Sequence, residues 1–422
     1  MIKTNKLLLA GLAALCFSCG ANSSKKVNNT KDKQYKYASV KDDVIHLDLK
    51  SAIKDSTIVN LSEICDSLIY IPLESNEKCI IGESKDIKFI TDDEFIFLED
   101  RGNLYKFNMS GKFLLQFGKR GRGPKEYKCS SFCIDRKNKR VYANAASKGR
   151  LMQFDYNGKL ISEDVKFPLG QIEYISSSNT IVTPGLFKLG EKDSLDFSCL
   201  TEIDLNGNIK SKLISKIYPL TPKDGAPKFG LEFPGADIYK YNNRIYYHEV
   251  RNDTIFSKTE KGRKAHIILN NKEFRKGLSS WKFGGMTGGN KFSIILGETT
   301  WMSDYFTVKN ETDKYIFAET ISNAFIFDKE EGTLVCARCF KEDEKKKFFY
   351  NDFDNVNHFN QMKITNNEYI VDAVEAIDLI ERVEELKDEK KTNTSYYKKL
   401  KKITESITEE ANPVLILGRL KR

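Results

Sequence analysis

A cationic, glycine-rich segment holds the residues of this sequence best suited to chemistry with an anion. Residues 115–127 read LQFGKRGRGPKEY, so three glycines free the backbone among four basic side chains. Guanidinium groups such as those of Arg120 and Arg122 bind carboxylate, sulfate or phosphate through paired hydrogen bonds, and backbone amides can assist them. The segment is not a P-loop, because it lacks Gly-Lys-Ser/Thr and no helix is expected after it. The candidate binding residues here are Arg120, Arg122, Glu126 and Tyr127.

The same segment has a structural interpretation that the sequence leaves open. In that interpretation it is a loop crossing between two repeated units of the fold. Glu126 then pairs with a local arginine, and Tyr127 fills the apolar interface between the units.

Two tryptophans mark a second candidate site. Trp281 opens a glycine-rich stretch at residues 281–290, and Trp301 follows nearby. Aromatic rings on loops can stack on sugar rings, but they can equally cover an apolar rim. Residues 352–355, DFDN, offer oxygen ligands without the glycine and distal glutamate of a calcium loop, so we expect no metal site there.

The sequence predicts no catalytic residue, no metal site and no cofactor. The four histidines, at positions 46, 248, 266 and 358, have no metal-ligand spacing, and no Gly-x-Ser-x-Gly elbow is present. Cys336 and Cys339 have the spacing of a redox pair, but they continue a strand-like run instead of opening a helix. Alternate strand positions face opposite ways, so we expect these two cysteines to point apart.

Cys19 is the residue with the most specific predicted chemistry. Residues 1–18 contain two lysines and then an apolar run from Leu7 to Phe17, which is too short to span a bilayer and is typical of a secretory signal peptide. The run ends in Phe-Ser-Cys-Gly, which resembles the lipobox of bacterial lipoproteins, although Cys16 stands where leucine is usual. The resemblance implies cleavage before Cys19 and attachment of acyl chains, palmitate among them, to this cysteine. Two or three such chains hold a protein firmly to a membrane. The alternative is an ordinary secretory signal with an incidental cysteine.

The segment after Cys19 is polar, and the remaining chain has mixed charge. Residues 19–43 are almost free of aliphatic side chains, so we predict a flexible tether there. The formal net charge of +9 is modest for 422 residues, and basic and acidic residues alternate throughout. Nucleic-acid binders instead gather basic charge on one face, so we expect no nucleic-acid partner.

A repeat organises residues 44–422. Five segments share a short apolar strand, an acidic or amide residue, a tight turn with glycine, and a second strand. The turn glycines lie at positions 111, 158, 207, 262 and 332. Their first intervals are roughly 50 residues, which suits one four-stranded propeller blade. Adding one blade closed by the chain ends, we predict an all-β, six-bladed β-propeller, with five or seven blades as alternatives.

One region departs from the β pattern. Residues 372–411 are rich in Glu, Lys, Leu and Ile without Pro or Gly, which predicts a helical hairpin inserted in the propeller. Tyr396, Leu400, Ile403 and Ile407 share one face of the second helix. We expect this face to pack on the propeller rim, with a partner-binding coiled coil as the alternative. Residues 413–420 then form a strand that closes the ring.

The sequence resembles a family at residues 115–127, at 66–74 (DSLIYIPLE) and at 412–417 (NPVLIL). These segments are similar to the six-bladed β-propeller lipoproteins of Gram-negative anaerobes, which are related to NHL- and TolB-like propellers. The Gly-x-Gly-Pro-x-Glu-Tyr signature, Gly121 to Tyr127, is the most specific part. The resemblance implies a fold and a location, and it transfers no catalytic residue.

Three functions remain open at this point. The first is a non-catalytic binding or scaffold lipoprotein of the cell envelope, anchored by lipid in the outer membrane, with a glycan, peptide or protein partner. The second is a propeller hydrolase or lyase whose site lies in the central funnel; His248 or His266 would be its best base. The third is a sensor or adaptor that works through the helices of residues 372–411.

Overall fold

The computed structural model describes seventeen stretches of the chain, and all structural statements below concern them. They are residues 33–82, 87–121, 123, 126–145, 148–166, 170–188, 195–217, 232–234, 236–249, 252–260, 262–270, 306–359 without 321–322, 343–344 and 357, and 363–422 without 389–393. The chain divides between Lys31 and Asp32 into two units, and only the second contains described residues. The signal peptide and Cys19 therefore lie outside the described residues.

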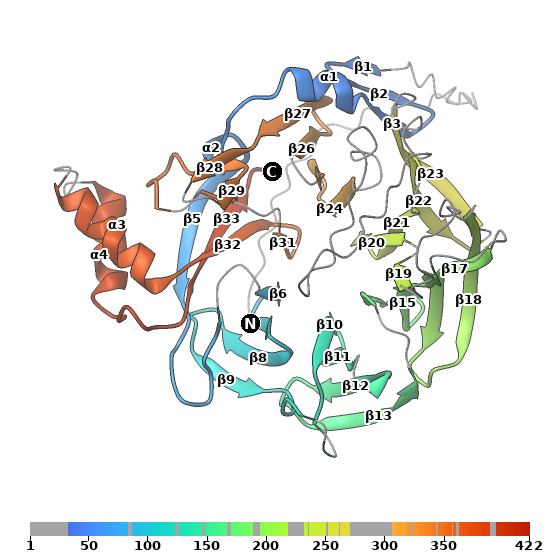
Figure 1. The fold of residues 1–422 in the computed structure, drawn as a ribbon, viewed down its shortest axis with the longest axis horizontal. Helices are drawn as coiled ribbons and strands as arrows, with labels where there is room; N and C mark the ends of the chain where they lie inside the picture. The colour runs from blue at the N-terminus through green and yellow to red at the C-terminus, as the bar shows by residue number, and fades with distance from the viewer. Residues whose placement is uncertain are drawn as a thin grey trace, which may run out of the picture. The chain divides into compact units, whose positions relative to one another are not determined.

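Six blades of four antiparallel strands form a β-propeller around a common axis; five are separate four-stranded sheets, and the fourth is part of a seven-stranded sheet (Figure 1). Blade 1 consists of β6 (Lys88–Thr91), β7 (Phe95–Asp100), β8 (Asn103–Asn108) and β9 (Phe113–Gln116). Blade 2 consists of β10 (Cys129–Asp135), β11 (Arg140–Ala145), β12 (Arg150–Asp155) and β13 (Leu160–Lys166). Blade 3 consists of β14 (Glu173–Ile175), β15 (Thr180–Pro184), β17 (Leu195–Asp204) and β18 (Ile209–Ile217).

The second half of the chain builds the other three blades. Blade 4 consists of β20 (Ala236–Tyr241), β21 (Arg244–Glu249), β22 (Thr254–Thr259) and β23 (Gly262–Leu269). Blade 5 consists of β24 (Thr307–Glu311), β25 (Tyr315–Glu319), β26 (Asn323–Asp328) and β27 (Thr333–Arg338). Blade 6 consists of β31 (Lys363–Thr365), β32 (Tyr369–Val374), β33 (Val414–Leu420) and β5 (Cys65–Pro72). The predicted six-bladed propeller is confirmed.

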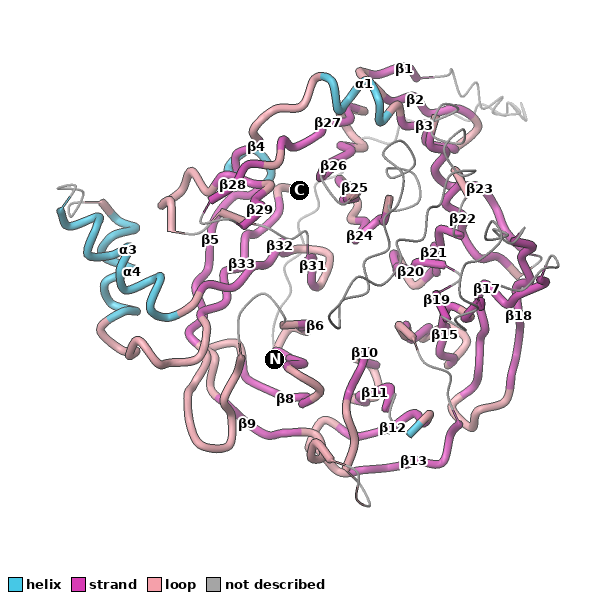
Figure 2. The backbone as a smooth tube through the Cα atoms, in the orientation of Figure 1, coloured by secondary structure: helices cyan, strands magenta, loops and turns pink. Residues whose placement is uncertain are grey.

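Short strand pairs lie between the blades. They are β16 (Leu186–Lys188) with β19 (Glu232–Pro234), β28 (Phe340–Glu342) with β29 (Lys345–Lys347), and β30 (Phe349–Tyr350) with β4 (Val59–Asn60). The strands and their connections can be followed along the backbone in Figure 2.

The five predicted glycine turns each join the two outer strands of one blade. Gly111 lies between β8 and β9 with φ +85°, and Gly158 lies between β12 and β13 with φ +81°. A residue with a Cβ rarely adopts these angles, so the turn type depends on glycine. Blades 1 to 5 therefore show the repeat, and blade 6 has no such hairpin.

Blade 6 is built from both halves of the chain. Strand β33 pairs with β32 on one side and with β5 on the other, and Ile416 lies opposite Tyr70 of β5. The outermost strand thus comes from the N-terminal part and its neighbour from the C-terminal end. This pairing closes the ring, as the sequence predicted for the last strand.

The predicted tether is too long at its C-terminal end. Strands β1 (Lys33–Tyr35), β2 (Ala38–Lys41) and β3 (Val44–Leu47) extend the outer edge of blade 4, where β3 runs parallel to β23. Few aliphatic side chains are needed there, because backbone pairing with an existing sheet edge orders the segment. Ala38 is buried in the core that blades 4 and 5 share.

The N-terminal segment then continues around the outside of blades 5 and 6. Helix α1 (Leu49–Lys54) follows β3, and the Thr57 amide donates a hydrogen bond of 3.1 Å to the Cys336 carbonyl of β27. Strand β4 and helix α2 (Leu61–Ile64) lead from there into β5.

Two helices interrupt blade 6 between β32 and β33: α3 (Ala376–Asp388) and α4 (Ser395–Thr404). The helical region starts later than the predicted residue 372, because Tyr369–Val374 is the second strand of the blade and is buried on both faces. Amino-acid composition does not indicate this strand pairing, which depends on the tertiary structure. Leu379, Val383, Tyr397 and Leu400 are buried in the same core as blade 6, so the pair packs on the propeller. None of the helices in the described stretches is long and apolar enough to cross a membrane.

Apolar cores fill the interfaces between neighbouring blades. Six of the cysteines, 65, 79, 129, 133, 199 and 336, are buried there as thiols. Cys336 belongs to the core between blades 4 and 5, whereas Cys339 packs against the core of blades 5 and 6, so the two point apart as predicted. Burial raises the pKa of the Cys336 thiol to about 12, which makes it a poor nucleophile.

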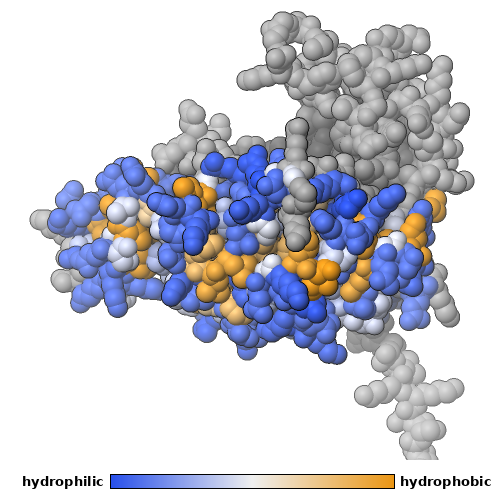
Figure 3. Space-filling view, turned by 90° about the horizontal axis from the view of Figure 1, so that it is seen from below, coloured by the Kyte–Doolittle hydropathy of each residue, from blue (hydrophilic) through white to orange (hydrophobic). Residues whose placement is uncertain are grey.

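The side of the ring shown in Figure 3 is mainly hydrophilic, with small groups of apolar side chains among the charged ones. Large apolar residues that are exposed include Leu114, Ile161 and Ile209, one on each outermost strand of blades 1 to 3. Single exposed apolar residues are normal on protein surfaces and do not define a docking site.

Candidate functional site

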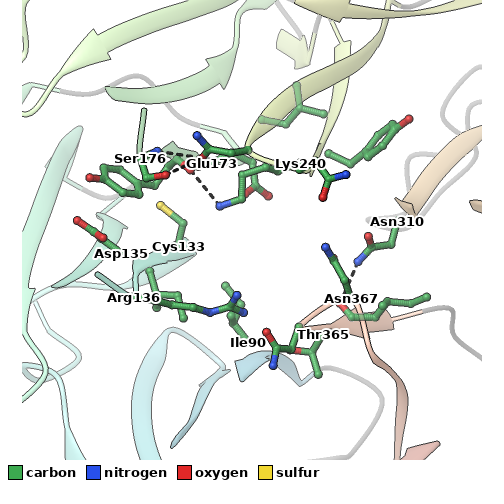
Figure 4. A pocket seen from close by; sticks show the side chains of 18 of the residues that line it. Ile90, Cys133, Asp135, Arg136, Glu173, Ser176, Lys240, Asn310, Thr365 and Asn367 are labelled. Carbon is green, nitrogen blue, oxygen red and sulfur yellow. Dashed lines mark hydrogen bonds between the residues drawn. The ribbon is translucent and has the colours of Figure 1, made fainter. Parts of the chain in front are cut away.

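A cavity of about 480 Å³ lies on the propeller axis, at the end where the first and second strands of the blades are joined (Figure 4). Every blade contributes to its wall from the innermost strand or the turn that follows. The charged and amide- or hydroxyl-bearing aliphatic lining residues are Asp135, Arg136, Lys137, Gln171, Glu173, Ser176, Lys240, Asn242, Asn243, Lys309, Asn310, Thr365, Asn366 and Asn367. Ligand sites of proteins commonly have this volume.

Hydrogen bonds between neighbouring blades fix the wall of the axial cavity. Arg136 of blade 2 donates to the Thr91 carbonyl of blade 1 at 2.9 Å, and the Thr91 amide donates to Thr365 Oγ1 of blade 6 at 2.7 Å. Asn310 of blade 5 donates to the Ile364 carbonyl of blade 6 at 3.2 Å. Because the blades hold one another in place, the lining side chains are preorganised.

The junctions on the opposite side of the ring are built in the same way. Gln171 of blade 3 donates to the Ile238 carbonyl of blade 4 at 2.9 Å, and Lys240 Nζ donates to the Tyr174 carbonyl at 3.0 Å. Ser131 of blade 2 donates to the Gly170 carbonyl next to blade 3 at 2.7 Å.

Lys240 and Glu173 form the charged centre of the wall. In Figure 4 the Lys240 side chain extends from β20 toward β14, where Glu173 lies. Burial raises the pKa of the Glu173 carboxyl, and the charge of Lys240 and a hydrogen bond from Gln171 oppose that rise. The ammonium of Lys240 has three N–H donors, of which the described contacts use one.

The other charged lining groups differ in the partners that they have. Asp135 caps its own turn, accepting hydrogen bonds from the Lys137 and Asn138 amides at 3.1 and 3.2 Å. Lys309 is paired with Glu319 at 2.5 Å. Arg136 and Lys137 are exposed at the β10–β11 turn, and neither has a carboxylate partner within the described residues. The cavity therefore has a surplus of positive charge.

In the glycine-rich segment, one backbone amide that could bind an anion binds the segment's own glutamate. The Gly123 amide donates a hydrogen bond of 2.9 Å to Glu126 Oε2. A Cβ placed on Gly121 would collide with the same carboxylate, so the backbone wraps closely around it. Glu126 thus occupies the place where the loop would otherwise receive an external anion.

Tyr127 lies inside the protein and not on the loop surface. It is 1% exposed, its hydroxyl donates a 3.0 Å hydrogen bond to the Phe117 carbonyl, and its ring lies 5.8 Å from that of Phe154. It belongs to the core between blades 1 and 2, which agrees with the structural interpretation of the segment.

The structure does not unite the binding residues predicted from sequence. Arg120 is exposed on the glycine-rich loop, and neither it nor Glu126 or Tyr127 lines the axial cavity. Arg122, Trp281 and Trp301 lie outside the described residues.

None of the four histidines lines the axial cavity. His266 is on β23, the outermost strand of blade 4 proper, and lies 2.9 Å from Glu311 Oε2. Both ring nitrogens of His248 face backbone carbonyls, those of Phe306 at 2.8 Å and Asn252 at 2.6 Å. A funnel enzyme therefore loses the two bases that the sequence offered.

The oxygen atoms of the DFDN segment also have structural partners. Asp352 accepts hydrogen bonds from the amide and hydroxyl of Ser62 at the start of α2. Asp354 accepts a 2.6 Å hydrogen bond from the buried Tyr70 hydroxyl. Within the described part of the chain, no three His, Cys, Asp or Glu side chains are grouped to hold a metal ion.

The residues of the axial cavity were missed by sequence reasoning. Polar pairs recur in the turns between the first two strands of the blades, as Asp92-Asp93, Lys137-Asn138, Asn242-Asn243 and Asn366-Asn367, and the last three of these turns contribute lining residues. The recurrence of polar pairs at this position of the repeat is the signal that would have located them.

A family model described as "Domain of unknown function (DUF4934)" matches residues 44–419. The chain belongs to this family. The match covers all six blades and the helix pair of this DUF4934 protein. The comparison with curated proteins gave no match.

Several solved structures resemble the chain at low sequence identity. A Bacteroides fragilis protein provisionally described as exported has 17% identity and a TM-score of 0.57, over 87% of this chain and 98% of that one. A DUF4221 member from Bacteroides vulgatus has 10% identity and a TM-score of 0.43, over 85% and 97% of the two chains. Virginiamycin B lyase from Staphylococcus aureus has 11% identity and a TM-score of 0.34, over 83% and 99%. At these identities the likeness concerns the fold alone.

Proposed function

We propose that this DUF4934 protein is a non-catalytic binding protein of the bacterial cell envelope that takes its ligand in the axial cavity. The observation that carries the proposal is the cavity itself, a preorganised polar recess to which all six blades contribute. The predicted lipid on Cys19 is its attachment to the membrane, and the assignment to NHL/TolB-like lipoproteins of the outer membrane belongs to the same proposal. The similarity to a protein provisionally described as exported agrees with this location.

Binding is favoured over catalysis by the chemistry of the lining. General acid–base catalysis needs a group that takes a proton near neutral pH, most often histidine, and no histidine reaches the cavity. Its one thiol, Cys133, is buried, and burial raises the pKa of that thiol well above its usual value. The alternative, a hydrolase or lyase acting in the funnel, would have to rely on Glu173 and Lys240.

The helix pair does not favour a sensor or adaptor. Leu379, Val383, Leu386, Tyr397 and Leu400 are buried in the core of blade 6, and among the large apolar residues of the described helices only Ile377 is exposed, which is too little for an apolar stripe.

A cavity-blocking substitution tests the proposal. Ser176 is exposed at the cavity mouth, so Ser176→Trp is expected to fill the opening without disturbing the core. The control is Asn157→Trp, at an exposed outer turn of blade 2. We expect polysaccharide or peptide fractions of a cell envelope to bind the wild type and the control, with at least tenfold weaker binding to Ser176→Trp, measured by biolayer interferometry.

The same experiment also separates the alternatives. Equal binding to both tryptophan variants, or no binding to the wild type, contradicts the use of the cavity. A bound molecule recovered with unchanged mass after long incubation supports a non-catalytic role, whereas a changed mass favours the hydrolase or lyase.

The proposed anchor is tested by substituting the two neighbouring cysteines in the full chain. Cys19→Ser is expected to abolish incorporation of labelled palmitate in a Gram-negative host, because the acylated sulfur is lost. Cys16→Ser keeps that sulfur and is expected to retain both the label and the membrane association. Label that persists in Cys19→Ser would contradict lipidation at this residue.

A further inference from the structure

We propose that the axial cavity recognises a sugar acid, a carboxylate carried on a hydroxylated frame, with Lys240 and Arg136 as the groups that bind the carboxylate. This inference rests on the proposed function and names the class of ligand.

The balance of charge in the wall favours an anion. Lys309 is neutralised by Glu319. The remaining cations, Arg136, Lys137 and Lys240, outnumber the two carboxyl groups of the wall, Asp135 and Glu173. The two Asp135 oxygens accept hydrogen bonds from Lys137 and Asn138 of its own turn, and burial raises the pKa of Glu173.

The positions of Arg136 and Lys240 suit a carboxylate. They come from blades 2 and 4, and each is held by one hydrogen bond to a backbone carbonyl of a neighbouring blade. The guanidinium keeps further donors in a fixed fork, and the ammonium keeps two. An ionised acceptor makes stronger hydrogen bonds with such donors than a neutral one.

Side-chain amides at the cavity mouth suit hydroxyl groups. Two asparagine pairs line it, at residues 242–243 in blade 4 and 366–367 in blade 6. Within the described residues, the side-chain amides of Asn242 and Asn367 have no hydrogen-bond partner in the protein. An amide both donates and accepts, as a sugar hydroxyl does, so the two groups satisfy each other in either direction.

The size of the recess fits a chain end and not a long polymer. A cavity of about 480 Å³ holds a ligand of small-drug size, which corresponds to one or two sugar rings. A sugar acid at the end of a polysaccharide, or released from one, matches both the volume and the charge.

The test compares probes of matched shape on the folded protein. Galacturonate and its dimer are the acidic probes, galactose is the neutral isostere, and inorganic sulfate is an anion without the frame. We expect the acidic sugars to bind at least about tenfold more tightly than galactose by calorimetry. Lys240→Met is expected to remove at least about nine-tenths of that affinity, and Lys240→Arg to restore part of it.

Lys212→Met is the matched control, because it removes the same charge from an exposed position on the outermost strand β18 that does not line the axial cavity. Its affinity for galacturonate is expected to stay within about twofold of wild type. Arg136→Met gives a second, independent loss if Lys240→Met does not fold.

Three other outcomes would contradict the inference, each at a different point. Equal binding of galactose and galacturonate shows that the cavity binds without selecting an anion. Sulfate binding as tight as that of galacturonate shows an anion site without a sugar frame. If no probe binds while Ser176→Trp still blocks an envelope ligand, the proposed function stands and the ligand class is wrong.

Discussion

Removal of residues 414–422 is expected to abolish cooperative unfolding of the propeller. This segment contains β33, which is held between β32 and β5 in blade 6. Without it, β5 loses its partner strand, β32 keeps only β31, and blade 6 loses the pairing that joins its N-terminal and C-terminal parts. Val414, Leu415 and Ile416 are fully buried, alternately in two different blade cores, so both cores open together. Near-UV circular dichroism during a thermal melt measures the effect.

A point substitution provides a graded version of this experiment. Ile416→Ala is expected to lower the free energy of unfolding by about 2–5 kcal/mol, because it leaves a cavity at a fully buried position. Deletion of Arg422 alone is the control, since its side chain is 89% exposed and pairs only with Glu368 among the described residues. A truncated protein that melts at the wild-type temperature would show that β33 does not hold the ring closed.

The blades were predictable because their signals are local. A turn such as Ser110-Gly111 needs positive φ at the glycine, and the strands on either side carry their own alternation. The sixth blade has no glycine turn of its own, because its two outer strands come from opposite ends of the chain. It could be predicted only by adding one closing blade to the five that the turns indicate. The start of the helical region was not predictable, because the strand Tyr369–Val374 pairs along its whole length with β33, whose residues lie 40 or more positions away along the chain.

The candidate site was not predictable for a related reason. Lys240 and Glu173 stand in strands that read as ordinary blade sequence, and only the closing of the ring brings them to one wall. By contrast, the segment from Gly118 to Tyr127 has a conspicuous composition, yet its Gly123 amide already binds its own Glu126, which also lies against Gly121. Composition reveals which groups are present, but it does not reveal whether another part of the chain already binds them.

Tyr127→Ala is expected to destabilise the protein by about 3–5 kcal/mol, whereas Arg120→Ala, seven residues earlier in the same loop, is expected to change the stability by less than about 0.5 kcal/mol. Tyr127 is an almost completely buried ring between blades 1 and 2 with a satisfied hydroxyl, and Arg120 is exposed. Urea unfolding, monitored by far-UV circular dichroism, measures both changes in the free energy of unfolding.

Smaller substitutions then show how much individual groups of the loop contribute to stability. Tyr127→Phe removes only the hydrogen bond to the Phe117 carbonyl and is expected to cost about 1 kcal/mol. Gly121→Ala places a methyl group against the Glu126 carboxylate and is expected to destabilise the loop, while Gly121→Ala combined with Glu126→Ala relieves the collision.

If the loop were instead a binding site for an external anion, Arg120→Ala would weaken envelope binding without altering stability, and Glu126→Ala would strengthen it by vacating the Gly123 amide. Unchanged binding in both variants leaves the loop as a joint between blades and the axial cavity as the site of recognition.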